Sequence, residues 1–318
     1  MNSILRGFLL ILPMFFVMAA GNILFNRHFL RQNDIDTLSK ILFWIIAPAV
    51  LFRNLFHITD GIGINPSFAA GIFICAVSLP VLAAVTEKYI AGQRDIRRVA
   101  LAAAASMRPN TIFMGLPTVQ IIFGDQAIGL LSLYVAIALP LYNLLSPVTS
   151  EIILASGTSR GVLCFIRTAF HKLIRNPMVV APVCGMILLA AGVKSLPVSL
   201  DKSLNMLASA ATGISLLALG ATINFSDMGK AFKNCWREVI TRLLLHPAML
   251  FLWFAYFPVN RDLMNVSVIL TAMPTAATLF VLSKGIGLDS VMAGEITVIT
   301  TLASALTIPL WIAVLGII

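Results

Sequence analysis

The chain reads Ser-Met-Arg-Pro-Asn-Thr-Ile-Phe-Met-Gly-Leu-Pro from Ser106 to Pro117, in the middle of an apolar run of membrane-spanning length. Pro109 has no N–H and its ring clashes with the preceding helical turn, while Gly115 and Pro117 weaken the helix further. Lipid tolerates a broken helix only where the freed backbone groups face protein or a watery cavity. Many secondary transporters build their binding site at such a break. The stretch therefore predicts the centre of a transporter.

The composition is that of a membrane protein. Hydrophobic residues make up 59% and charged residues 11% of the 318 positions, whereas soluble domains carry about 25% charged residues. The mean hydropathy is +0.97. In a soluble protein the net charge of +9 would suggest a nucleic-acid partner, but here the basic residues sit in short loops. We therefore expect a lipid bilayer, and no nucleic acid, as partner. The four cysteines show no metal-ligand spacing, so no metal site, disulfide framework or cofactor is predicted.

Ten apolar segments come close to the roughly 20 residues that a membrane-spanning helix needs. They cover residues 5–25, 36–56, 67–90, 96–123, 127–153, 171–193, 203–224, 238–258, 263–283 and 289–317. We take the first as a spanning helix and not as a cleaved signal peptide, because it is long enough and many spans follow. The expected fold is an all-α polytopic membrane protein with ten transmembrane helices.

The positions of the basic residues predict how the chain is oriented. The loops after segments 1, 3, 5, 7 and 9 hold 15 of the 22 Lys and Arg residues, and the remaining loops and the two ends hold 5. Lys40 and Arg108 lie inside segments. Because cytoplasmic loops carry an excess of Lys and Arg, both termini are expected on the non-cytoplasmic side of the cell (inner) membrane.

A weak internal repeat divides the chain into two halves. Shifting the sequence by 165 residues places Pro109 on Pro274, and places segments 1 and 2 on segments 6 and 7. An odd number of spans in each half requires opposite topologies, which is the pattern of inverted-repeat transporters. We predict a first five-helix repeat at 1–154, a short cytoplasmic connector at 155–170 and a second, inverted repeat at 171–318. Helices 4 and 9 are expected to be broken and to cross near the bilayer midplane.

Several short motifs resemble the auxin efflux carrier family, which includes plant auxin carriers and bacterial malonate-type transporters. The similarity covers the whole chain. It is carried by residues 109–117 (PNTIFMGLP), 123–125 (FGD), 175–177 (RNP), 217–221 (LALGA), 47–52 (APAVLF) and 272–274 (AMP).

The resemblance implies a scaffold of helices 1, 2, 6 and 7 that often forms a homodimer, and a moving transport unit of helices 3–5 and 8–10. It also implies a small organic anion as substrate, bound where the two proline breaks cross. The long central loop of the larger plant carriers is absent, which favours a compact bacterial type. Arg108 stands where plant members tend to carry an apolar residue, which argues against an aromatic, auxin-like substrate.

Arg108 is the most informative charged residue for predicting the binding site. An arginine at membrane depth costs roughly 3 kcal/mol or more unless it snorkels, pairs or faces water. We favour a role in gripping a substrate carboxylate over a structural pair with a carbonyl or carboxylate. Asn110 and Thr111 follow Pro109 and could bind substrate, or only cap the half-helix that begins beyond them.

The remaining candidates have equally open roles. Pro274 and Thr275 form the second break, and Thr278 follows it. Asn143 lies in segment 5, where it either contacts substrate or makes a hydrogen bond between helices. Glu295 could carry a coupling proton, although a carboxylate this close to a helix start more often interacts with the helix dipole or solvent.

The leading hypothesis is a secondary carrier of mono- or dicarboxylates, malonate- or auxin-like, that works by alternating access. One alternative is a sodium- or proton-coupled symporter or antiporter of the related bile-acid or cation-antiporter fold. No aspartate falls in the middle of a segment, as a cation antiporter would need. A membrane enzyme is disfavoured because no DxxD or HExxH motif occurs. A receptor would leave the two breaks unexplained.

Overall fold

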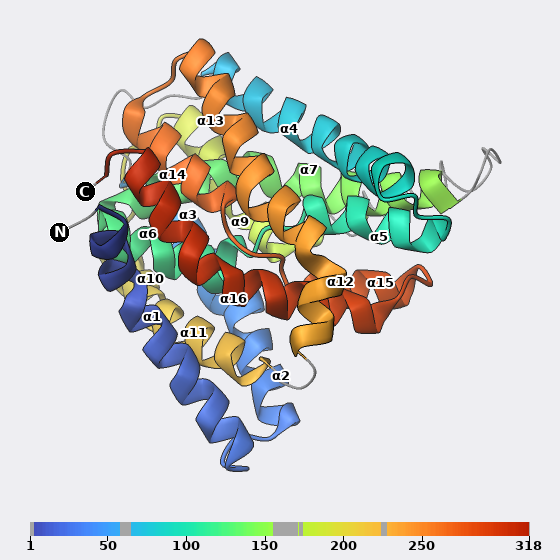
Figure 1. The fold of residues 1–318 in the computed structure, drawn as a ribbon. Helices are drawn as coiled ribbons and strands as arrows, with labels where there is room; N and C mark the ends of the chain where they lie inside the picture. The colour runs from blue at the N-terminus through green and yellow to red at the C-terminus, as the bar shows by residue number, and fades with distance from the viewer. Residues whose placement is uncertain (1–2, 58–64, 155–170, 172–173, 224–227, 318) are drawn as a thin grey trace.

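The computed structural model describes residues 3–57, 65–154, 171, 174–223 and 228–317, and in these ranges the chain is helical with no β-strand (Figure 1). The predicted connector at 155–170 lies outside them. The α-helices are α1 (Ser3–Asn26), α2 (Gln32–Ile41), α3 (Ala47–Leu55), α4 (Pro66–Val85), α5 (Ile96–Ser106), α6 (Leu116–Phe123), α7 (Ile128–Leu154), α9 (Pro177–Ala190), α10 (Val198–Ser209), α11 (Ala211–Ala221), α12 (Met228–Ile240), α13 (His246–Tyr256), α14 (Arg261–Thr271), α15 (Thr278–Gly285) and α16 (Ser290–Val314).

Seven helical stretches in the described residues are long and apolar enough to cross a membrane. They run over Ile4–Asn26, Gln32–Leu55, Pro66–Ile90, Asp125–Leu154, Val198–Ala221, Ala231–Tyr256 and Ser290–Val314. The other three predicted segments are shorter or interrupted. The sixth is α9, 14 residues long, which begins late because Asn176 caps its first turn by accepting a hydrogen bond from Met178 N at 3.0 Å. The fourth and ninth are each divided into two helices.

Prolines explain three of the wide turns inside the spans. The π-helical turns η1 (Leu42–Ile46), η3 (Thr111–Gly115) and η5 (Thr241–Leu245) are each followed, two residues later, by a proline at the start of the next α-helix. A proline there has no N–H to donate, and its ring pushes away the carbonyl four residues earlier. The turn widens as a result, and a wide turn reorients the side chains that it carries.

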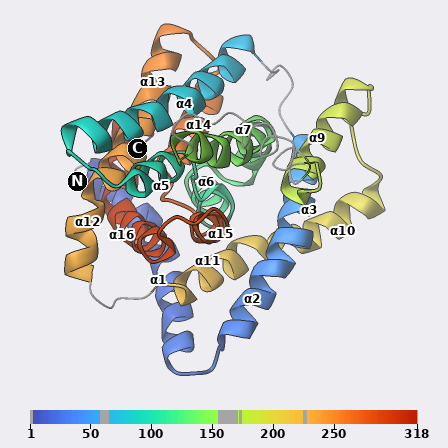
Figure 2. The ribbon, with the colours of Figure 1, turned by 90° about the vertical axis from the view of Figure 1, so that its right-hand side faces the viewer.

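Close backbone contact joins α1 to α11, which lie side by side (Figures 1 and 2). Gly220 of α11 lies directly against the backbone of Met18, and Gly21 of α1 lies against the backbone of Leu217. A Cβ atom at either glycine would overlap these backbone atoms. Glycines thus let the two helices approach as small residues do in other membrane helix pairs.

The two interrupted segments lie in the middle of the molecule, between the helices around α1, α2 and α11 and those around α4, α12 and α13 (Figure 2). Met114 of η3 and Met273 of the second interruption belong to one buried cluster with side chains of α1, α11 and α16. The interruptions are therefore packed on several sides by helices from distant parts of the chain. That is the protein environment that broken helices require.

Candidate functional site

The first interruption lies between α5 and η3. The helix α5 ends at Ser106, and the backbone is irregular from Met107 to Asn110. Asn110 caps the next half-helix, because its side-chain oxygen accepts a hydrogen bond from Phe113 N at 3.2 Å. Thr111 is buried, and its N–H donates to the Pro109 carbonyl at 2.9 Å. The capping role considered for Asn110 is therefore present in the structure.

The second interruption, between α14 and α15, meets the first through backbone hydrogen bonds. Asn110 N donates to the Pro274 carbonyl, and Ala276 N donates to the Arg108 carbonyl, both at 2.8 Å. These bonds form an isolated antiparallel β-bridge between Pro109 and Thr275. Proline chemistry frees these backbone groups from their own helices, and each interruption then satisfies part of the other.

Arg108 extends from this bridge toward α15. Its Nε donates to Thr278 Oγ1 at 3.3 Å, and this is the side-chain hydrogen bond that it forms within the described residues. No ion pair to Arg108 occurs in this part of the chain. The side chain is partly exposed, so its two terminal nitrogens are available to an anion. Thr278 thus joins the site as the partner that orients the guanidinium.

A second arginine, Arg242 of η5, lies at the first interruption and was not among the site residues predicted from the sequence. It is one of the 15 basic residues assigned to cytoplasmic loops, yet the structure places it near the middle of the span Ala231–Tyr256, with no exposed surface. Its Nη1 donates to the carbonyl of Ser106, the last residue of α5, at 3.2 Å. The signal was present in the sequence, because residue 242 falls inside the apolar segment 238–258. Fourteen basic residues remain for the cytoplasmic loops, so the expected orientation is unaffected.

Within the described residues, neutral hydrogen-bonding groups and no carboxylate surround Arg242. Its Nη1 also donates to His246 Nδ1. A guanidinium can only donate, so Nδ1 accepts and the neutral imidazole carries its proton on Nε2. That nitrogen lies 3.3 Å from the Tyr142 hydroxyl, which lies 2.9 Å from the Tyr134 hydroxyl. The chain of hydrogen bonds is buried throughout, and it leaves the positive charge of Arg242 uncompensated.

Three polar atoms around the two interruptions are buried and have no hydrogen-bond partner in the part of the chain that the structure describes. They are Nε and Nη2 of Arg242 and Oγ1 of Thr275. The backbone of Thr275 is satisfied, because its N–H donates to Thr300 Oγ1 of α16 at 3.0 Å. Buried polar groups in proteins are nearly always hydrogen-bonded. Unmet donors at a site of positive charge are what a bound carboxylate would satisfy.

Two predicted site residues are not joined to this group by any hydrogen bond. Asn143 lies on α7 beside Tyr142, is partly buried, and makes no side-chain hydrogen bond to a described residue. Glu295 lies on α16, which packs against α12, and it is near Cys235 of that helix. Its carboxylate forms no ion pair within the described residues.

Two further arginines form ion pairs where α12 meets α5 and the turn η2 (Thr86–Ile90) that follows α4. Arg98 pairs with Glu238, and Arg237 pairs with Glu87, each at 2.5 Å. Glu87 and Glu238 are almost fully buried. A small cavity between these helices is lined by Thr86, Glu87, Ser106, Arg237, Glu238 and Thr241, among others. These charges are balanced within the protein, unlike those of Arg108 and Arg242.

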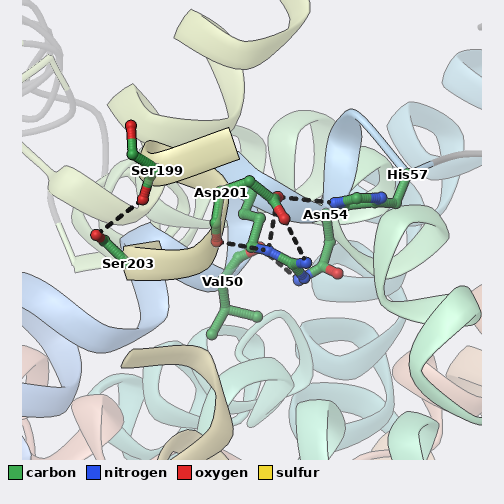
Figure 3. Close-up of polar contacts among 7 residues, drawn as sticks. Val50, Asn54, His57, Ser199, Asp201 and Ser203 are labelled. Carbon is green, nitrogen blue, oxygen red and sulfur yellow. Dashed lines mark hydrogen bonds and ion pairs between the residues drawn. The ribbon is translucent and has the colours of Figure 1, made fainter. Parts of the chain in front are cut away.

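A third charged group joins α3 to α10 (Figure 3). Arg53 forms an ion pair with Asp201 at 2.9 Å, and His57 Nε2 lies 3.0 Å from the same carboxylate. Arg53 Nε also donates to the backbone carbonyl of Asp201 at 3.3 Å. The group holds the beginning of α10 to the end of α3 and is partly exposed.

Comparison with known proteins yields one family and several distant relatives. A family profile described as "Membrane transport protein" matches residues 7–312. An uncharacterized transporter of Methanocaldococcus jannaschii is 24% identical over 288 residues, which cover 89% of this chain and 90% of that protein. An uncharacterized transporter of Escherichia coli K12 is 23% identical over 316 residues, 96% of each chain. A Rhizobium meliloti protein named "Putative malonate transporter" is 29% identical over 148 residues, covering 45% of this chain and 43% of that protein.

Proposed function

The chain belongs to the membrane transport protein family, the auxin efflux carrier family that its motifs resemble, and on that premise we propose that it carries small organic anions by alternating access at the paired interruptions. The observation that carries the proposal is the positive charge of Arg108 beside the Pro109–Thr275 bridge, without a carboxylate partner among the described residues. An intramembrane charge without a protein partner is a functional-site hypothesis by default. A substrate carboxylate would supply the missing partner.

In the proposed site, Arg108 binds the anion, and Pro109, Asn110, Thr111, Pro274 and Thr275 shape its surroundings. The N-terminus of η3, capped by Asn110, adds a favourable dipole for negative charge. The hydroxyl Oγ1 of Thr275 is buried and has no hydrogen-bond partner among the described residues, so it could donate to a substrate oxygen. Asn143 and Glu295 remain candidates for substrate contact and proton coupling, although neither is hydrogen-bonded to this group.

We further propose ten membrane segments in two inverted repeats, at 1–154 and 171–318, joined by the connector 155–170. The backbone pairing of the two interruptions, one from each half, supports this arrangement. The beginning of α1 and the end of α16 lie on the same side of the molecule (Figure 1), which agrees with an even number of crossings. Both termini would then face the non-cytoplasmic side of the cell (inner) membrane.

Transport would move helices 3–5 and 8–10 relative to a scaffold of helices 1, 2, 6 and 7. Contacts of α1 with α11, of α3 with α9 and of α10 with α3 support the scaffold unit. The two units meet at a buried cluster that includes Met14 and Met18 of α1, Met114 of η3 and Met273 of the second interruption. Unbranched methionine side chains adapt to a changing surface, which suits a contact that must slide.

The scaffold would also form the homodimer interface. Helix α10 has no buried residue within the chain, and the apolar side chains of Val198 and Met206 on it are 71% and 75% exposed. Such side chains need lipid or a second copy of the chain to cover them. Light scattering of the detergent-solubilised protein would give the mass of the assembly, and a monomeric mass would contradict the dimer.

The deciding experiment is uptake of radiolabelled malonate into proteoliposomes that contain the wild-type protein or Arg108→Gln. We expect uptake at low substrate concentration to fall by about tenfold or more, because a hydrogen bond to a charged group contributes about 1.5–3 kcal/mol. The control is Arg175→Gln, which removes an exposed arginine before α9 and leaves the site intact. Unchanged uptake by Arg108→Gln, with unchanged affinity, would contradict the assigned role of Arg108.

A further inference from the structure

We propose that Arg242 is a second cationic contact for the transported anion and that, together with Arg108, it selects substrates with two negative charges over substrates with one. This inference rests on the proposed function and deepens it. The burial of Arg242, its contacts and the charges around it support this role.

Arg242 is buried without a compensating negative charge among the described residues. It has no exposed surface, and within the described residues no carboxylate pairs with it. Burying a charge is costly unless the charge is paired and fully hydrogen-bonded. The groups that do contact it, His246 and the Ser106 carbonyl, carry no net negative charge. A bound anion would remove this cost.

The geometry of the guanidinium nitrogens of Arg242 also supports this role. Among the described residues, Nη1 alone has hydrogen-bond partners, while Nε and Nη2 are buried and have none. These two nitrogens form one edge of the planar guanidinium, the edge that binds a carboxylate with two parallel hydrogen bonds. A purely structural arginine would be expected to use this edge, as Arg53 does with both carboxylate oxygens of Asp201.

The position of Arg242 relative to Arg108 also supports this role. Arg242 holds the carbonyl of Ser106, and Arg108 follows two residues later at the same interruption. The end of α5 contributes a partial negative charge of about 0.5 units, which attracts Arg242 but occupies only one of its nitrogens. Two full positive charges therefore lie at one interruption without a carboxylate from the described residues. A monoanion would balance one of them, and a dianion would balance both.

A small cavity borders the contacts of Arg242. The cavity between α4, α5 and α12 is lined by Ser106, whose carbonyl Arg242 binds, and by Thr241, the residue before Arg242. Its two carboxylates, Glu87 and Glu238, are held by their own arginines. Neither carboxylate pairs with Arg242.

The test compares malonate with its monoamide malonamate, in which a neutral amide of similar shape replaces one carboxylate. Proteoliposome uptake of labelled malonate is inhibited by each unlabelled compound, and the ratio of the two apparent affinities is measured. In the wild type we expect malonate to bind more tightly than malonamate. In Arg242→Gln this ratio should fall by about tenfold or more, because only malonate loses a charged partner. In Arg108→Gln both affinities should fall.

Two variants keep the result interpretable. Arg242→Lys retains the charge without the fork and should keep part of the preference for malonate, which a merely structural role would not predict. Arg175→Gln should leave the ratio unchanged. Thermal unfolding in detergent shows whether each variant folds. A folded Arg242→Gln with an unchanged ratio, or a folded Arg242→Lys that loses the preference as completely as Arg242→Gln, overturns the inference alone. If the wild type binds neither compound, the proposed function fails as well.

Discussion

The arginines of this protein fall into two groups that differ in their partners. Arg98, Arg237 and Arg53 each lie against a carboxylate and tie one helix to another. Arg108 and Arg242 lie at the paired interruptions and have only hydroxyl, carbonyl or imidazole partners among the described residues. Both groups include strongly buried members. Burial alone therefore does not distinguish a structural arginine from a binding one, whereas the presence of a counter-charge does.

This difference follows from the energetics of buried charge. The attraction of its carboxylate offsets part of the desolvation free energy of a paired arginine. Removing the arginine therefore leaves that carboxylate buried without a counter-charge, which destabilises the fold. The desolvation free energy of an unpaired arginine is not offset in the unliganded protein, and a bound anion can offset it. The four predictions below separate the two groups by stability, and they run from the largest expected change in unfolding free energy to the smallest.

Arg98→Ala should be the most destabilising change. It leaves Glu238 buried without its partner, and breaking a buried pair in this way costs roughly 3–5 kcal/mol. Thermal unfolding in detergent should show a large fall in the midpoint. The double variant Arg98→Met with Glu238→Leu removes both charges and should recover most of the loss. If Arg98→Ala unfolds at the wild-type midpoint, the pair is not structural.

Malonate should stabilise the wild-type protein through the unpaired arginines. A ligand at a hundred times its dissociation constant stabilises the folded state by about 2.7 kcal/mol. The same concentration should give a much smaller shift in Arg108→Gln, because that variant lacks the partly exposed guanidinium of the site. Arg175→Gln should respond as the wild type does. An equal shift in all three proteins would mean that malonate acts elsewhere.

Removing the pair between α3 and α10 should have a small effect. Arg53 and Asp201 are partly exposed, and pairs in contact with solvent contribute about 0.2–1 kcal/mol. A double-mutant cycle of Arg53→Gln and Asp201→Asn measures the coupling free energy directly. Because exposed charges are screened, this coupling should weaken in high salt. A coupling as large as that of Arg98 and Glu238 would remove the distinction between exposed and buried pairs.

Arg242→Met should change stability least, to within about 1 kcal/mol of the wild type. The substitution loses the hydrogen bonds to Ser106 and His246, but it also removes an uncompensated buried charge, and these two effects oppose each other. Unfolding of the unliganded variant in detergent measures the net change. A loss comparable to that of Arg98→Ala would show that Arg242 supports the fold in the absence of substrate.

Much of the architecture was accessible from the sequence because the responsible forces are local. Seven of the ten predicted segments are long apolar helices in the structure, since hydropathy over about 20 residues decides whether a helix can span a membrane. The interruptions at Pro109 and Pro274 follow equally directly from the missing N–H of proline. The cap at Asn110 also depends on residues within one turn.

The contacts between residues of the site could not be predicted from local sequence features. Arg242 meets Ser106 across 136 positions of sequence, and Arg108 meets Thr278 across 170. No periodicity within one segment indicates which face of a helix will meet another helix. Residue 242 falls inside the apolar segment 238–258, so its place in a span was accessible from the sequence. Its partners were not, because a charge near a segment end looks the same whether it snorkels to water or turns into the protein.

By itself, then, the sequence determined that this protein is a polytopic membrane protein whose apolar segments are interrupted at two prolines. Only the tertiary structure decided that the interruptions share backbone hydrogen bonds, and that Arg242 joins them from a different helix without a counter-charge from any described residue. The physical reason is the range of the interactions. Solvation and proline geometry act on neighbouring residues, whereas the partners of a buried charge depend on how distant helices pack.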